Sequence, residues 1–187
     1  MTSPVRPSKA EILAAEGATV PDVVAPGLDI LLCGINPGLY SGAVGHHFAR
    51  PGNRLWKALH GAGLTPRLLS PFEEHELLSH GIGITNLVER ATATADRLTN
   101  DELIKGRRRL ERKVRRLRPR CVALLGLTSY RIAFGKTKAV IGRQEERLAG
   151  AAIWLLPNPS GLNAHYQVPE LARVYGELRA ARDAGSL

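Results

Sequence analysis

The chain has 187 residues, which suits one domain spanning 1–187 that can bury a core without disulfides or metals. Lys and Arg number 26 against 17 Asp and Glu, and this net charge of +9 favours a polyanionic partner, chiefly nucleic acid. Two cysteines exclude a cluster held by four thiolates, and no secretory or membrane-spanning apolar run is present, so we expect a cytoplasmic, nucleoid-associated protein without membrane contact.

The N-terminal arm, residues 1–27, is predicted to hold one short helix and a linker. Ser8 and Glu11 form a capping-box pattern that begins the helix, and Gly17 is a typical stop. Pro21 punctuates the linker that follows.

The first strand is predicted at 28–33, an apolar run that leads into a long glycine-rich loop, residues 34–52. Long loops without secondary structure are commonly functional. Asn53 is predicted to cap a short helix, and a capping box over 70–73 begins a second helix that ends near residue 80.

The second half of the chain alternates strands and helices. A loosely alternating strand at 82–88 precedes a helix that Thr99 caps and Pro119 ends. The later predicted elements are a strand at 121–125, a helix from about Ser129, a strand at 151–156, a loop at 157–161 and a last helix from Pro169.

This alternation predicts an α/β fold, a three-layer α/β/α sandwich around a central, mainly parallel sheet. Ligands of such sheets bind beyond the carboxyl ends of the strands. The polar loops 34–52 and 157–166 each follow a strand, so we expect them to meet at one edge.

Motifs for phosphate, dinucleotide and metal binding fail on spacing. Gly135-Lys136-Thr137 lacks the earlier glycine of a phosphate-binding loop, and the glycines at 34, 38 and 42 lack the dinucleotide spacing. His46-His47 has no third ligand beside it. We therefore expect no metal and no cofactor, and a nucleotide-binding metabolic enzyme is disfavoured.

Four segments occur in an order that one family shares. They are Gly34-Ile-Asn-Pro-Gly38, Phe48-Ala-Arg-Pro-Gly-Asn-Arg-Leu-Trp56, Gly83-Ile-Thr-Asn-Leu-Val-Glu-Arg90 and Asn158-Pro-Ser-Gly-Leu162. From about residue 20 to residue 180 the chain resembles the mismatch-specific uracil/thymine DNA glycosylases. The resemblance implies a uracil-DNA glycosylase-like fold and hydrolysis of the N-glycosidic bond of a base that has been extruded from duplex DNA.

Asn36 is the first candidate catalytic residue. An amide that follows a strand end can orient a water molecule without acting as a strong base. The resemblance gives Asn36 this role and implies that relatives with aspartate at the same place are stronger catalysts. A neutral amide stabilises a cation-like sugar less than a carboxylate does, so slow turnover is expected.

Four further residues are candidates for substrate binding. Gly38 leaves room for backbone N–H groups to approach the leaving base. The resemblance implies that Phe48 stacks on the extruded base and that Ser41 hydrogen-bonds DNA phosphate or the base pocket. Asn86 is predicted to line the same pocket. The alternative for Phe48 is a core anchor, and for Ser41 and Asn86 a local turn bond.

The second loop supplies the remaining candidates. Asn158 is predicted to contact the base or sugar in a catalytic role, at a place where better-known uracil glycosylases carry a histidine. Ser160, Gly161 and Leu162 are predicted to contact DNA. Leu162 resembles a wedge that fills the space left by the extruded base, the alternative being a core leucine after a turn.

Together with the residues, the resemblance predicts a monofunctional glycosylase of base excision repair that acts as a monomer on double-stranded DNA with a mismatched or damaged base. Uracil opposite guanine is the expected substrate, with thymine or modified cytosine as further candidates. Two alternatives stay open: the same fold with a preference for deaminated purines, and a non-catalytic nucleic-acid-binding protein.

Residues 105–120 hold ten Lys or Arg and one acid, so either phosphate contacts or a solvated face fits them.

Overall fold

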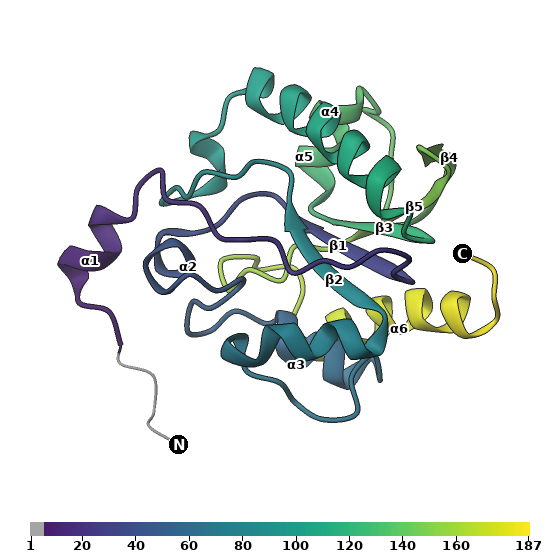
Figure 1. Ribbon diagram of the computed structural model, residues 1–187, viewed down its shortest axis with the longest axis horizontal. Coiled ribbons are helices and arrows are strands. Elements are labelled where there is room, and N and C mark those ends of the chain that lie inside the picture. Colours follow the sequence, from purple (N-terminus) through teal and green to yellow (C-terminus); the bar gives the residue numbers. More distant parts are fainter. Residues whose placement is uncertain (1–5) are drawn as a thin grey trace.

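A five-stranded sheet forms the centre of the computed structural model, which describes residues 6–187 (Figure 1). The first five residues of the predicted N-terminal arm lie outside this range. The strand order is β2-β1-β3-β5-β4. The strands are β1 (Ile30–Gly34), β2 (Ile82–Asn86), β3 (Cys121–Leu125), β4 (Gly142–Leu148) and β5 (Ala151–Leu156).

Four of the strands, β2, β1, β3 and β5, run parallel to one another. Every residue in them is buried, because helices cover both faces of the sheet. Their sequences are therefore short apolar runs, and this is the feature that predicted them. The expected three-layer fold with a mainly parallel sheet is confirmed.

Strand β4 was not predicted from the sequence. It pairs antiparallel with β5 through a tight turn in which Ala149 and Gly150 have φ of 48° and 94°. Its residues alternate between partly covered and exposed, with charged side chains through its middle, so the apolar alternation of an ordinary strand is missing. Charges on an edge strand hinder edge-to-edge pairing with other molecules.

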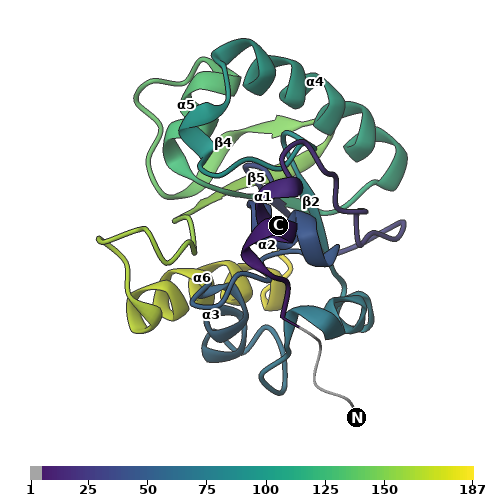
Figure 2. The same cartoon turned by 90° about the vertical axis from the view of Figure 1, so that its left-hand side faces the viewer.

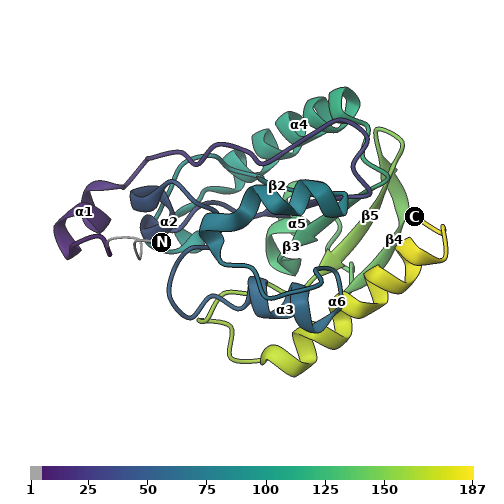
Figure 3. The ribbon, with the colours of Figure 1, turned by 60° about the horizontal axis from the view of Figure 1, so that its bottom comes forward.

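Two helical layers cover the sheet on opposite faces (Figures 2 and 3). One face packs against α3 (Leu55–Gly61), η1 (Pro71–His80) and α6 (Val168–Asp183), and the other against α4 (Asn100–Leu117) and α5 (Leu127–Phe134). Each layer encloses its own cluster of buried apolar side chains. The parallel strands thus share one carboxyl edge, which both helical layers leave open to the loops.

The cap signals mark the helix ends well. Ser8 begins α1 (Lys9–Ala14) and Thr99 begins α4, each with a complete capping box. Segment η1 also has its capping box and matches the helix expected to end near residue 80, and it is a 3₁₀ helix with a kink at Glu73. Residues 34–52 are not all loop, because Leu39–Val44 forms the short helix α2, which Gly45 ends at φ 72°.

The N-terminal arm covers the otherwise free edge of β2. Val23 and Ile84 exchange two backbone hydrogen bonds of 2.9 and 2.8 Å, and Gly17 and Ala18 bond the backbone of Ala91. Both outer strands of the sheet are therefore protected, β4 by charge and β2 by this arm. Among residues 6–187 no helix has the length and apolar character needed to cross a bilayer.

Candidate active site

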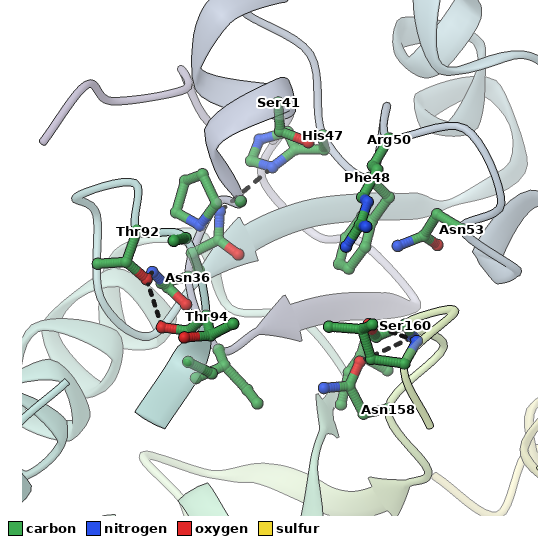
Figure 4. Close-up of a pocket in the computed structure, with 18 of the residues that line it drawn as sticks. Asn36, Ser41, His47, Phe48, Arg50, Asn53, Thr92, Thr94, Asn158 and Ser160 are labelled. Atoms are coloured by element: carbon green, nitrogen blue, oxygen red, sulfur yellow. Dashed lines mark hydrogen bonds between the residues drawn. The ribbon is translucent and has the colours of Figure 1, made fainter. Parts of the chain in front are cut away.

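A cavity of about 460 Å³ opens at the carboxyl edge of the sheet (Figure 4). It lies where β1, β2, β3 and β5 end, so the loops after β1 and β5 meet there. Of the nine residues predicted to form the site, the lining includes eight: Asn36, Gly38, Ser41, Phe48, Asn86, Asn158, Ser160 and Leu162. Gly161 lies in a neighbouring depression that shares Ser160 and Leu162 with the cavity.

Two hydrogen bonds orient the amide of Asn36 in the lining. Its Nδ2 donates to the carbonyl oxygen of Arg90 at 3.0 Å and to Oγ1 of Thr92 at 2.7 Å. The Thr92 hydroxyl donates in turn to the carbonyl of Thr94 at 2.8 Å, so its oxygen is the acceptor in the bond from Asn36. Both donors of the amide are used, so Oδ1 is left as an acceptor for a ligand or water.

Gly38 and Ser41 belong to the start of α2. Gly38 is the N-cap, and a Cβ built on it would meet nothing within 4 Å, so glycine here keeps the cavity open. The first-turn N–H groups of a helix have no partner within the helix and suit a developing negative charge. Ser41 is buried, and its Oγ accepts from the backbone N–H of Ala49 at 3.1 Å. That bond holds the loop between α2 and Ala49, so the Ser41 hydroxyl already has a structural role.

Phe48 stands at the side of the cavity in a strained backbone conformation. Its φ is 51°, a region that non-glycine residues rarely occupy and that clusters at functional sites. Its ring lies over Gly34, where an added Cβ would sit 2.9 Å from Cζ. Trp56 holds the Phe48 carbonyl through Nε1 at 3.4 Å. The ring is half-buried against the core, so it serves as an anchor and presents a face to the cavity.

Asn86 is the last residue of β2 and is buried beside His47. The two side chains meet at 3.3 Å between Nδ2 of Asn86 and Nδ1 of His47, and Nε2 of His47 lies 2.9 Å from the carbonyl oxygen of Pro21. Burial lowers the pKa of His47 despite the opposing influence of Glu74, so the ring is neutral at pH 7.

The amide of Asn158 is partly committed to its own turn. Oδ1 accepts from the backbone N–H of Ser160 at 3.0 Å, and the Asn158 carbonyl accepts from Nδ2 of Asn163 at 3.0 Å. Within residues 6–187, Nδ2 of Asn158 has no hydrogen-bond partner. This amide can therefore donate to a ligand, but its oxygen serves the loop.

Leu162 is 65% exposed at the tip of the same loop, which contradicts the alternative of a core leucine. Arg54, which precedes α3, fastens this loop to the first one. Its guanidinium donates to the carbonyls of Asn163 and Tyr166, each at 2.7 Å, and to that of Gly161 at 3.4 Å. An exposed apolar side chain thus stands beside the cavity on an anchored loop.

Several lining residues escaped the sequence analysis. Thr92 and Thr94 orient Asn36, and His47 contacts Asn86, yet none belongs to a recognisable local pattern. Among residues 6–187 no group of three side chains suited to hold a metal ion gathers, around His47 or elsewhere. The signal that was available was a pair of histidines next to Phe48.

The charged groups of the lining are few. Apart from the neutral His47, they are Arg50 and Asp96, both exposed at the rim. A hydrogen bond with the Thr94 side chain lowers the pKa of Asp96, so it is ionised at pH 7. The interior of the cavity therefore offers uncharged amides, a hydroxyl and an aromatic face, which suit a neutral, planar, polar ligand.

A mainly parallel sheet covered by helices on both faces, with this amide-lined cavity at its carboxyl edge, defines a protein of the uracil-DNA glycosylase fold class. A family model described as the uracil DNA glycosylase superfamily matches residues 21–179, and the chain belongs to that superfamily. Membership supports a hydrolase of the DNA glycosylase type.

One solved structure illustrates the fold. It is the solution NMR structure of a "putative Uracil DNA glycosylase" from Methanosarcina acetivorans, which is similar with a TM-score of 0.57. The sequences are 17% identical over 87% of this chain and 98% of that chain. At this identity the likeness shows the fold alone.

Proposed function

We propose that the protein is a monofunctional, metal-free DNA glycosylase of base excision repair. It extrudes uracil mispaired with guanine from double-stranded DNA and hydrolyses its N-glycosidic bond. The observation that carries the proposal is the locked amide of Asn36, whose Oδ1 is left as an acceptor in a cavity that the second polar loop completes.

Access to the base comes first. A base stacked in a duplex is out of reach of any cavity, so the nucleotide must rotate out. Leu162, exposed beside the cavity mouth, suits the vacated space in the base stack. Arg54 anchors its loop, so insertion of Leu162 takes place from a held position.

Cleavage then needs little from the protein besides positioning. The bond between sugar C1′ and base N1 breaks with its electron pair going to the base, and a water oxygen bonds C1′ and loses a proton to solvent. Asn36 Oδ1 accepts a hydrogen bond from that water and orients it. The N–H groups that begin α2 stabilise the leaving anion. No carboxylate lies in the interior of the described cavity, so turnover is slow.

Base selection belongs to Asn86 and Phe48. The oxygen of Asn86 accepts from the ring N–H of uracil, which cytosine lacks at the same position. Phe48 offers a stacking face, which is worth about 1–3 kcal/mol per base. The described lining contains no lysine, so a Schiff-base lyase step has no nucleophile and the enzyme is monofunctional.

The test uses a duplex with one G·U pair, followed by alkaline cleavage of abasic sites. Wild-type protein is expected to produce strand breaks, and Asn36→Ala to lose nearly all base release while still binding the duplex. Asn100→Ala, which changes an exposed asparagine at the start of α4 outside the lining, is the control and keeps activity.

Two outcomes would replace the proposal. Release of hypoxanthine or xanthine but not uracil from a panel of single-lesion duplexes would indicate the alternative with deaminated purines. Binding without release of any base would indicate a non-catalytic DNA-binding protein.

A further inference from the structure

Three polar groups from distant parts of the chain line up at the wall of the cavity, and the two side chains among them are buried. The carbonyl of Pro21, in the N-terminal arm, faces Nε2 of His47 at 2.9 Å. Nδ1 of the same ring faces the side-chain nitrogen of Asn86, at the end of β2, at 3.3 Å. His47 is 2% exposed and Asn86 7%, so bulk water does not compete for these bonds.

The line has only one consistent arrangement of protons. A carbonyl oxygen can only accept, so Nε2 of His47 carries the hydrogen. In the neutral ring Nδ1 then holds a lone pair, and the group that faces it must be a donor. The amide of Asn86 therefore turns Nδ2 toward His47 and Oδ1 away from it.

The oxygen of Asn86 has a defined place. A Cβ built on Gly34 would lie 2.4 Å from Oδ1, which puts this oxygen against the backbone of β1 beside the cavity. Had His47 been protonated on Nδ1, an acceptor would have been required there and the amide would present its NH₂ group instead. The tautomer of one histidine thus decides whether the cavity shows an acceptor or a donor.

We propose that His47 is the positioning residue that sets base selectivity: its Nε2–H tautomer, fixed by the Pro21 carbonyl, turns the oxygen of Asn86 toward the bound base. The cavity then favours a base with a ring N–H over one with a ring lone pair at that position. This inference rests on the proposed function. It also gives the N-terminal arm a role in the site.

The surroundings of His47 set the pH at which its ring gains a proton and the orientation of the Asn86 amide is lost. Burial lowers its pKa and is the largest influence; Glu74 of η1, Pro21 and Asp22 of the arm act in the opposite direction, and neighbouring His46 acts with burial. The ring therefore stays neutral at pH 7 and gains a proton only at a pH below the ordinary histidine pKa. Protonation puts a hydrogen on Nδ1, the Asn86 amide rotates, and the preference for a ring N–H weakens.

The experiment compares 5-fluorouracil with 5-fluorocytosine, each opposite guanine, in single-turnover excision. The two bases share the activating fluorine and differ in the ring N–H and the exocyclic group. The ratio of their rates is measured in a pH series from about 7.5 down to about 4.5, because burial moves the titration of His47 below the ordinary histidine pKa. Wild-type protein is expected to favour 5-fluorouracil, with a ratio that falls as the pH is lowered.

Two variants separate positioning from packing. His47→Phe removes both ring nitrogens, so the ratio should fall about tenfold, the value of one buried hydrogen bond, and should no longer change with pH. His47→Asn keeps an acceptor on the atom that corresponds to Nδ1 and should restore part of the ratio. An unchanged ratio in His47→Phe would overturn the proposal.

A direct measurement covers the case in which a variant fails to fold. The ¹⁵N shifts of the His47 ring in wild-type protein report which nitrogen carries the hydrogen, and the expected form is Nε2–H at about pH 7.5. An Nδ1–H or doubly protonated ring at that pH would overturn the inference. If wild-type protein released neither base nor uracil itself, the proposed function would fail instead, whatever the tautomer.

Discussion

The amide of Asn36 is held by two acceptors, and this has a consequence for an aspartate placed at the same position. We expect Asn36→Asp in this chain to lower stability by about 1–3 kcal/mol at pH 7, because a carboxylate oxygen would face the Arg90 carbonyl, now 3.0 Å from Nδ2. This repulsion raises the carboxyl pKa in the folded state, so the lost stability should return as pH falls through that value. Urea unfolding across the pH range measures it, and a variant that gains activity with unchanged stability at pH 7 would contradict it.

Two glycines of the site offer a matched pair of substitutions. An alanine at Gly34 would meet Asn86 Oδ1 at 2.4 Å and Phe48 Cζ at 2.9 Å, so Gly34→Ala should cost about 1–3 kcal/mol and disturb both side chains. An alanine at Gly38 meets nothing within 4 Å. Gly38→Ala should therefore keep its Tm. It should lose uracil excision if the bound base occupies the space that the added methyl group would fill. Thermal unfolding and excision are measured together; equal Tm values for the two variants would refute the contrast.

The sequence indicated the lining but not how it is oriented. Asn36 and Asn158 stand in local motifs directly after strands, and Phe48 stands in a motif later in the segment that follows β1, so chain order alone suggests a site. Thr92 and His47 act through hydrogen bonds to residues 56 and 39 positions away, and no local pattern encodes such bonds. The sequence analysis predicted that the Asn158 amide contacts the base or sugar, but it did not show that the amide oxygen accepts from the backbone N–H of Ser160 and leaves Nδ2 for a ligand.

At the scale of elements, Arg54 joins the two loops of the site. Three carbonyls of 161–166 accept from its guanidinium, and its backbone N–H donates to the Pro159 carbonyl at 3.0 Å. We expect Arg54→Ala to free the loop that carries Leu162 and to slow uracil excision about tenfold or more, mainly through weaker substrate binding.

Arg173→Ala is the control for this variant, because it removes an exposed arginine of α6 whose partner is Glu177. Single-turnover rates at rising protein concentration separate binding from cleavage. A loss confined to the cleavage step would show that Arg54 does not act through the loop.

Element prediction failed where apolar periodicity was absent. Strand β4 exposes charges on alternate residues, and α2 is a single short stretch inside a glycine-rich segment. Both are stabilised by neighbours: β4 by β5, and α2 by close packing at Gly42, where a Cβ would lie 2.9 Å from that of Ala91. Tertiary contacts of this kind override weak local preference. The buried parallel strands carry their own apolar signal and were all predicted.

At the scale of the whole molecule, the cavity and the most basic helix surface lie on different parts of the fold. Helix α4 returns from the carboxyl edge to the start of β3, so its basic C-terminal half lies toward the edge remote from the cavity. Arg108, Arg112 and Arg116 are exposed, stand four residues apart on one side of the helix, and form no ion pair within residues 6–187. Like charges at this spacing destabilise a helix, so folding does not account for them.

We therefore expect this row to contribute to binding of undamaged duplex through phosphate contacts. Replacing the three arginines by glutamine should weaken binding and lower the slope of log affinity against log salt by up to about 2.7, since each phosphate contact contributes about 0.9. The charge-matched control replaces Arg173, Arg179 and Arg182 of α6, which pair with Glu177 and Asp183. Fluorescence anisotropy over a salt series measures both. Excision from a short G·U duplex at low salt should be the same in both triple variants. Equal salt slopes for the two would mean that only net charge matters for binding and that the α4 face is an ordinary solvated surface.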